Sequence, residues 1–303
     1  MAVAFPQVRV GEPVRFKTLA VFPLFTEPNG AVDYVLADEA IRDQLLTVQE
    51  VSEGGSVPEL LVENKGDLRV LFIEGEELVG AKQNRILNTS VLVAAKSRTK
   101  IPVSCVEHGR WGYKSKFFGS SGSHTPSKLR YALKSSVASS LRDSGTRHSD
   151  QGEVWHQVEM CQTVHAVNSD TMAMSDTFDA YKDQVAEFQQ NLKYVDGASS
   201  MAVVIGGKVV GCDLFDKPST CRKVWDRLLS GLVFDALEAK EASGTVETSA
   251  VDQLLATTSH AAWQPTEPIG EGDEFRAELE HGEQASALTF HDSLVHGSVL
   301  VGA

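Results

Sequence analysis

The chain has 303 residues, a length that fits one large domain or two of ordinary size. Its 42% hydrophobic and 23% charged residues are ordinary for globular proteins, which excludes a disordered chain, a collagen and a coiled coil. The net charge of −13 argues against general binding of nucleic acid or anionic membranes, because both attract a basic surface. No apolar run approaches about 18 residues and residues 1–11 lack a signal-peptide pattern, so we expect no membrane association.

The cysteines lie far apart, and no two of them have the CxxC spacing of a zinc site. They are Cys105, Cys161, Cys212 and Cys221. Widely spaced cysteines in a long chain are typical of buried free thiols in a reducing compartment, so we expect a cytoplasmic protein. His156, Glu159 and His165 match no metal-binding spacing, so no metal site is expected, and the pattern does not identify a cofactor.

Charge is distributed unevenly along the chain. Residues 82–147 contain 13 Lys or Arg and two acidic residues, a local net charge of +11. Residues 234–303 contain 13 acidic residues and two basic ones. One interpretation is a local anion-binding site in an acidic protein, and the other is that the two segments neutralise each other across the fold.

Short apolar runs separated by turn residues predict strands in the first third of the chain. The expected strands are 8–10, 16–21, 34–35, 60–62, 70–73, 91–93 and 101–106. A short helix is expected at Asp38–Leu46, where acidic residues occupy the first turn. The spacing of the strands favours a mixed or antiparallel sheet over helical crossovers.

The middle of the chain predicts two loops and a helix. Gly119–Pro126 is flexible in composition, and Asp143–Glu153 is polar with two glycines, so both are expected to be loops. Between them, Ser127 fits a helix cap before an apolar stripe from Leu129 to Leu141. The basic residues of this helix are Lys128, Arg130, Lys134 and Arg142.

The second half of the chain combines helices with a hairpin and terminal strands. Apolar residues recur every three or four positions over 178–192 and 224–236, which predicts two buried helices, and Ser249 and Asp252 fit the start of another. Gly206-Gly207 between two apolar runs predicts a β-hairpin. Further strands are expected at 275–279, 285–290 and 294–301.

These elements predict an α+β fold, with a mixed or antiparallel sheet of short strands and with helices in the central and C-terminal parts. We expect residues 1–303 to form one unit. The alternative is a strand-rich part, 1–118, and a helix-and-strand part, 154–303, joined by a mobile segment, 119–153.

Two polar segments lie at the ends of apolar strands. One is 74–85, followed by Asn88, and the other is 105–111. The apolar runs 91–93 and 101–103 lie between them. Functional sites are usually built from polar loops on a rigid sheet, so we expect the two segments to line one pocket.

Basic, amide and aromatic residues of these segments are candidates for ligand binding. Arg85 and Arg110 suit a diphosphate through charge-assisted hydrogen bonds, unless neighbouring glutamates pair with them. Trp111 suits stacking on an adenine or nicotinamide ring, or else a place in the core. The side-chain amides of Gln83, Asn84 and Asn88 can bind ribose hydroxyls, or else cap turns and bond the edge of the sheet. The set is Lys82, Gln83, Asn84, Arg85, Asn88, Arg110 and Trp111.

Carboxylates and one thiol are candidates for catalysis. Glu77 and Glu107 suit acid–base work on an N-glycosidic bond, unless they are solvated turn acids. Neighbouring strand residues point to opposite faces, so at most one of Glu76 and Glu77 is expected to point inward. Cys105 suits a nucleophile with His108 as its base, although the two side chains point apart on an extended segment.

Segments 74–85 and 101–111 resemble the ARPP family, whose name stands for ARG and rhodanese-phosphatase-superfamily associated protein. Val21–Phe25, Gly54–Leu60 and Gly206–Gly211 are similar too, so the resemblance spans most of residues 18–240. It implies an association with ADP-ribosylglycohydrolases and with other proteins that handle NAD or ADP-ribose. It implies no settled catalytic mechanism.

We therefore expect a protein of NAD or ADP-ribose metabolism that binds a phosphate-containing small molecule and acts as a hydrolase or transferase. The alternative is a non-catalytic ligand sensor or an adaptor for protein interactions. A third alternative is a homo-oligomer that pairs through the strands of residues 275–301.

Overall fold

The computed structural model describes residues 3–27, 32–240 and 248–302, and these residues form an α+β fold, which confirms the predicted class. The strands are β1 (Val8–Val10), β2 (Val14–Phe16), β3 (Leu19–Thr26), β4 (Tyr34–Leu36), β5 (Leu46–Glu50), β6 (Glu59–Asn64), β7 (Arg69–Phe72), β8 (Glu76–Gly80), β9 (Arg85–Leu87), β10 (Val91–Val93), β11 (Ser97–Cys105), β12 (Phe118–His124), β13 (Ser200–Ile205), β14 (Lys208–Phe215), β15 (Gln264–Thr266), β16 (Asp273–Glu278), β17 (Gln284–Phe290) and β18 (Ser293–Leu300). The helices are α1 (Ala37–Arg42), α2 (Ser127–Ser144), α3 (Gln151–Val164), α4 (Met174–Ala180), α5 (Lys182–Asn191), α6 (Pro218–Glu238) and α7 (Thr248–Ser259).

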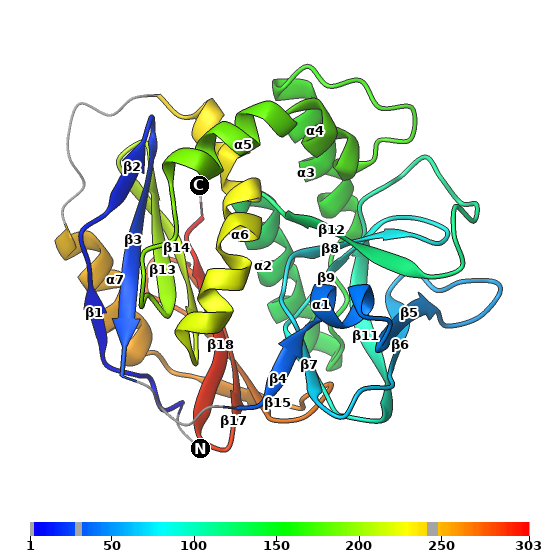
Figure 1. Cartoon of the computed structure of the whole chain (residues 1–303), viewed down its shortest axis with the longest axis horizontal. Coiled ribbons are helices and arrows are strands. Elements are labelled where there is room, and N and C mark those ends of the chain that lie inside the picture. Colours follow the sequence, from blue (N-terminus) through cyan, green and yellow to red (C-terminus); the bar gives the residue numbers. More distant parts are fainter. Residues whose placement is uncertain (1–2, 28–31, 241–247, 303) are drawn as a thin grey trace.

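A large sheet forms one side of the molecule. Its order is β1-β3-β13-β14-β18-β17-β16-β15, with β2 also paired to β3. Helix α7 covers one face, and α6, with α5 beside it, lies against the other face (Figure 1). The runs at 275–301, which the oligomer hypothesis used, pair with each other and with β14 inside this sheet.

The β13–β14 hairpin shows why this sheet is buried on both faces. Val203 and Ile205 pack in the core shared with α6, whereas Ala202 and Val204 pack in the core under α7. A strand with two buried faces needs a continuous apolar run instead of an alternating one. Gly206 and Gly207 turn the chain with φ of 55° and 83°, which confirms the predicted hairpin.

Two smaller sheets enclose a third core. One has the order β10-β7-β4, in which β4 and β7 are parallel, and the other has the order β12-β8-β9-β11-β6-β5. Apolar residues of both sheets share one buried cluster, which includes Leu60 and Val62 of β6 and Val70 and Phe72 of β7. Helix α6 lies between the large sheet and β12, so it joins the two halves (Figure 1).

Several local predictions are wrong, including the strand expected at 16–21, which a turn divides between β2 and β3. Gly119–Pro126, expected to be flexible, contains most of strand β12, which pairs with β8 and packs on α6. The single helix expected over 178–192 is two helices, α4 and α5, which break at Tyr181. The helix expected at Asp38–Leu46 is the shorter α1, because Leu46 already begins β5.

A close backbone approach holds β12 against α6. A Cβ on Gly231 would lie 2.3 Å from the carbonyl oxygen of Thr125 and 2.4 Å from that of His124. Only glycine leaves room for this contact. Gly231 therefore allows a central helix to lie directly against the chain after β12.

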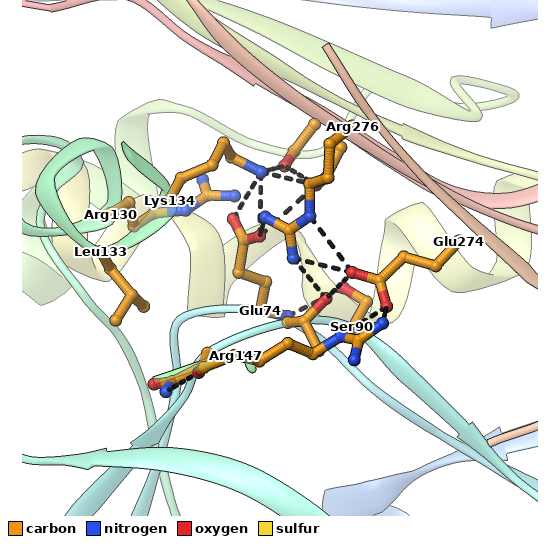
Figure 2. Close-up of polar contacts among 12 residues, drawn as sticks. Glu74, Ser90, Arg130, Leu133, Lys134, Arg147, Glu274 and Arg276 are labelled. Atoms are coloured by element: carbon orange, nitrogen blue, oxygen red, sulfur yellow. Dashed lines mark hydrogen bonds and ion pairs between the residues drawn. The ribbon is translucent and has the colours of Figure 1, made fainter. Parts of the chain in front are cut away.

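A buried ionic network connects α2 to both halves of the molecule. Lys134 of α2 lies 2.7 Å from a carboxylate oxygen of Glu74, and it also donates to Ser286 and Ser298 of the large sheet. Arg276 lies 3.7 Å from Glu74 and pairs with Glu274 at 2.9 Å (Figure 2). Burial lowers the pKa of Lys134 to about 8, although the nearby Glu74 carboxylate opposes this shift.

The same network extends on both sides of Lys134. Arg147, in the segment expected to be an exposed loop, is buried and lies 2.9 Å from Glu274. Arg130 of α2 holds both carboxylate oxygens of Asp213, at 2.9 and 2.7 Å. The basic segment 82–147 is thus partly neutralised by acids far along the chain, which was one of the two interpretations of its charge.

Within the described part of the chain, every helix is too short or too polar to span a bilayer.

Replacing Lys134 with Met is expected to lower the free energy of unfolding by about 3–5 kcal/mol, because Glu74 would remain buried without its closest counter-charge. Lys128→Met is the matched control on the same helix, because the ion pair of Lys128 with Glu238 lies at the surface and is worth about 0–1 kcal/mol. Urea unfolding of both variants measures the difference. Equal losses in the two variants would contradict the role assigned to Lys134.

Candidate functional site

The structure brings segments 82–85 and 105–111 together at the end of the six-stranded sheet. Arg85 of β9 is the cross-strand partner of Cys105 of β11. The side chain of Gln83 donates to the carbonyl of Glu107 at 2.8 Å, and the backbone N–H of Asn84 donates to the Glu107 carboxylate at 3.0 Å. The chain beyond the two paired strands is therefore held in one cluster.

Arg110 is the clamp that fixes this cluster. Its Nε and Nη2 bind the two carboxylate oxygens of Glu107 at 2.7 and 2.6 Å. The remaining guanidinium N–H groups donate to the backbone oxygens of Gly80, Ala81 and Gly112. All the donors of Arg110 thus have protein acceptors, so this residue positions the site, and no donor remains for the diphosphate expected from the sequence.

Glu107 is held as firmly as Arg110. Besides the two arginine contacts, its carboxylate accepts from the backbone of Asn84 and from the hydroxyl of Thr171. Burial raises the pKa of the Glu107 carboxyl, but the hydrogen bonds and charge of Arg110 outweigh burial and lower it overall. Glu107 is therefore an anion with occupied oxygens.

Arg85 is a fully buried charge of the cluster that forms no ion pair with any described residue. Its side chain is fully buried, and Nη1 donates to Gln83 Oε1 at 3.1 Å and to the carbonyl of Asn84 at 3.4 Å. Its Nε and Nη2 have no hydrogen-bond partner. Burial lowers the pKa of this guanidinium, and the nearby Cys105 and Glu50 oppose the shift.

The other buried arginines in residues 3–27, 32–240 and 248–302 all form ion pairs with carboxylates. They are Arg130, Arg147, Arg227 and Arg276. Arg85 forms no such pair, and a buried charge without a counter-charge costs several kcal/mol. Nε and Nη2 lie along the same edge of the planar guanidinium. The free donors therefore form the fork that binds two oxygens of a phosphate or carboxylate.

A loop and a turn cover Arg85 from the outside. The Trp111 ring is centred 5.9 Å from the guanidinium and is 50% exposed. Lys82 lies 5.2 Å from the same ring and donates to the carbonyl of Gly54 at 2.9 Å. Gly55 adopts φ +79°, and a Cβ there would meet Trp111 at 3.2 Å, so the turn can approach the ring only without a side chain.

The amides of Gln83 and Asn84 also serve the protein. Gln83 Oε1 accepts from Arg85 and from the Cys105 thiol, at 3.1 and 3.2 Å. Asn84 donates to Ser175 at 3.1 Å and accepts from the backbone of Gly80 at 3.1 Å. The Gln83 side chain orients Arg85, and the Asn84 side chain is bonded to Gly80 and Ser175, so neither amide is prepared for ribose in this geometry.

Cys105 and His108 do not form a pair. The Cys105 thiol is buried against Gln83, whereas the His108 ring lies on Trp155 with the ring centres 4.1 Å apart. Burial raises the pKa of the Cys105 thiol, and Arg85 opposes this only in part. The thiol is therefore neutral near pH 7 and does not neutralise Arg85.

Glu76 and Glu77 point to opposite faces of β8, as alternation requires, but both are fully buried, so the expectation that only one points inward is wrong. Glu76 pairs with Arg227 at 2.7 Å. The register pairs Leu78 with Arg85, which places Glu77 on the face of the ribbon opposite Arg85. Burial raises the pKa of Glu77 to about 8.

Asn88 lies apart from Arg85. Its amide donates to the carbonyl of Arg147 at 2.8 Å and accepts from Ser104 at 2.6 Å. Ser104 and Cys105 alternate along β11, so Asn88 and Arg85 are linked to opposite faces of this strand. The predicted set therefore divides: Arg85 keeps donors without a partner among the described residues and Trp111 is half-exposed, whereas Gln83, Asn84, Asn88 and Arg110 are bonded within the protein.

A family model described as the ARG and Rhodanese-Phosphatase-superfamily-associated Protein domain, ARPP-1, matches residues 7–300. The chain belongs to this family. No curated protein and no solved structure matches it significantly. The function of this ARPP-1 domain is therefore argued from its site.

Sequence reasoning missed three parts of the site in the ARPP-1 domain. These are the turn at Gly54-Gly55, the indole of Trp155 and the ring of Tyr113, which lies 5.1 Å from the Lys82 ammonium. The exposed run from Trp111 to Phe117 carried a signal, because it contains three aromatic residues and two lysines within seven positions. The contact between Gly55 and Trp111 could not be predicted from a local sequence signal, since it joins distant parts of the chain.

Replacing Arg85 with Met is expected to raise the free energy of unfolding of the ARPP-1 domain by about 1–3 kcal/mol, because it removes an uncompensated buried charge. Arg130→Met is the matched control and is expected to lower it by about 3–5 kcal/mol, because Asp213 loses its partner. Chemical unfolding of both variants tests this. A loss in Arg85→Met as large as in Arg130→Met would show that Arg85 has an internal counter-charge.

The raised pKa of Glu77 predicts a pH dependence. A carboxyl that titrates near 4.5 when unfolded and at about 8 when folded favours folding in its neutral form, so stability falls as pH rises through this window. Between pH 5.5 and 7.5 the wild type is expected to lose about 2 kcal/mol relative to Glu77→Gln. Urea unfolding at both pH values measures it, and a parallel response of the two proteins would rule out a neutral Glu77.

Proposed function

We propose that this chain binds a phosphate-bearing nucleotide ligand of the ADP-ribose class at Arg85. The observation that carries the proposal is the free Nε and Nη2 fork of a fully buried arginine that forms no ion pair. Two oxygens of one phosphate of the diphosphate, placed there, would satisfy both donors, and the single negative charge of that phosphate would neutralise Arg85. Buried donors without partners lower the stability of the free protein, and a ligand that satisfies them stabilises the protein on binding.

Lys82 and Trp111 support the same ligand class. The Lys82 ammonium lies next to the Trp111 ring and is positioned for a second phosphate. The half-exposed indole offers a face on which an adenine ring stacks. Because Trp111 covers Arg85, the ligand reaches the fork only when the ring turns outward, and the indole then lies beside the bound nucleotide.

The site favours binding without turnover over the hydrolase or transferase alternative. An N-glycosidic bond needs a carboxylate free to move a proton or to stabilise the sugar cation. Glu107 has both oxygens bonded to the protein, and Glu77 lies across the ribbon from Arg85. A ligand sensor therefore fits the contacts better, and the free thiols of the described residues suit a reducing cytoplasm.

Thermal unfolding with ADP-ribose, ADP, AMP and NAD tests the proposal. A ligand at about one hundred times its Kd adds about 2.7 kcal/mol, and we expect ADP-ribose to raise the Tm by about 5 °C. Arg85→Met should abolish this shift, whereas the exposed control Arg98→Met should retain it. No shift with any of the four ligands would overturn the proposal.

Chromatography of the incubated ligand separates the sensor from the enzyme. We expect ADP-ribose to be recovered unchanged after prolonged incubation with the protein. Product formed by the wild type and lost in Glu107→Gln, with binding retained, would establish the hydrolase or transferase alternative instead.

A further inference from the structure

A second exposed surface continues from Trp111 along the same loop. Trp111, Tyr113 and Phe117 are 50%, 55% and 40% exposed, although large aromatic side chains are usually buried. Lys114 and Lys116 lie between Tyr113 and Phe117 in the sequence and are exposed too. Exposed aromatic side chains combined with basic ones are typical of surfaces that stack bases and contact phosphates.

Lys82 links this surface to the Arg85 site. Its ammonium lies 5.2 Å from the centre of the Trp111 ring and 5.1 Å from that of Tyr113. One cation thus contacts two exposed rings. An anion bound at this ammonium would lie close to both aromatic side chains.

A groove lies beyond Tyr113. It has a volume of about 820 Å³ and is lined by residues 49–53 and 113–116. This volume lies within the range of small-molecule sites, about 300–1,000 Å³. The groove is therefore large enough for one nucleoside.

The charges of the groove suit a nucleoside joined to phosphate. Lys114 and Lys116 supply cations on one wall. On the other wall, Glu50 accepts from the backbone N–H of Lys82 at 3.3 Å, and Glu53 is exposed at the rim. Carboxylates accept hydrogen bonds from ribose hydroxyls, so these acids match the sugar while the lysines match the phosphates.

We propose that the groove is a second nucleoside subsite, and that the ligand class of this protein is a dinucleotide whose two nucleosides are joined through phosphates. The inference rests on the proposed function of the Arg85 site. The bridging phosphates bind Arg85 and Lys82, one base stacks on Trp111, and the other stacks on Tyr113 in the groove. Lys82 contacts both rings, so a phosphate held by its ammonium would lie near both bases.

Two ligands that differ by one base test the inference. Diadenosine diphosphate and ADP-ribose share the adenosine, the diphosphate and the second ribose, and they differ only in the second adenine. We expect calorimetry to show about tenfold tighter binding of diadenosine diphosphate, because it stacks one more ring. Tyr113→Ala is expected to remove this difference, so that the two ligands bind this variant with equal affinity.

Phe117→Ala is the matched control, because Phe117 is an exposed aromatic residue of the same loop that does not line the groove. It is expected to change neither affinity. Equal binding of the two ligands by the wild type would overturn the second subsite while leaving the Arg85 site standing, and so would an equal loss of both in Tyr113→Ala. Failure of both ligands to bind would overturn the proposed function itself.

Discussion

The pairing of buried charges is the constraint on which this structure depends. Glu74, between the strands of the smaller sheets, is fully buried and can remain ionised only because Lys134 and Arg276 lie beside it. Lys134 comes from α2 and Arg276 from the large sheet, so one carboxylate fixes three parts of the chain relative to one another (Figure 2). Apolar packing of α6 buries hydrophobic surface between the layers, and the ion pairs fix the position of the layers relative to one another.

Arg85 does not follow this constraint, because it is buried without a paired carboxylate among the described residues, whereas Arg110 and Glu107 next to it form an ion pair. Around it, Arg110 and Glu107 are fully bonded, and Gln83 orients the guanidinium through one nitrogen. The hydrogen bonds of Nη1 thus hold Arg85 in place, while Nε and Nη2 of Arg85 have no partner among the described residues. A protein that pairs its other described buried arginines gains nothing in stability from this arrangement, so the gain is expected at the level of ligand binding.

The sequence predicted the elements whose side chains follow a simple period. The hairpin at Gly206-Gly207 and the apolar helix α6 were predicted because local signals and burial agree there. Strand β8 was missed because it begins with two glutamates, of which Glu76 is paired with the distant Arg227. Strand β12 was missed because it is composed mainly of serines and glycines. A search for hydrophobic periodicity does not detect strands made largely of polar residues and glycine.

The same reasoning explains what could be foreseen of the site. Polar residues at the ends of neighbouring strands predicted that segments 82–85 and 105–111 would lie together, and they do. The different roles of Arg85 and Arg110 could not be foreseen. Arg110 is saturated mainly by backbone oxygens and by Glu107, and the positions of backbone oxygens depend on the folded loop and not on residue type.

The central claim is that the Arg85 fork holds an anion. Arginine side-chain Nε–H groups give resolved signals in a ¹H–¹⁵N correlation spectrum, and Arg85→Met assigns the signal of Arg85. During titration with ADP-ribose this signal is expected to shift with the fraction of protein bound, while that of Arg130, already paired with Asp213, stays in place. Saturation of the protein with no movement of the Arg85 signal would contradict the account.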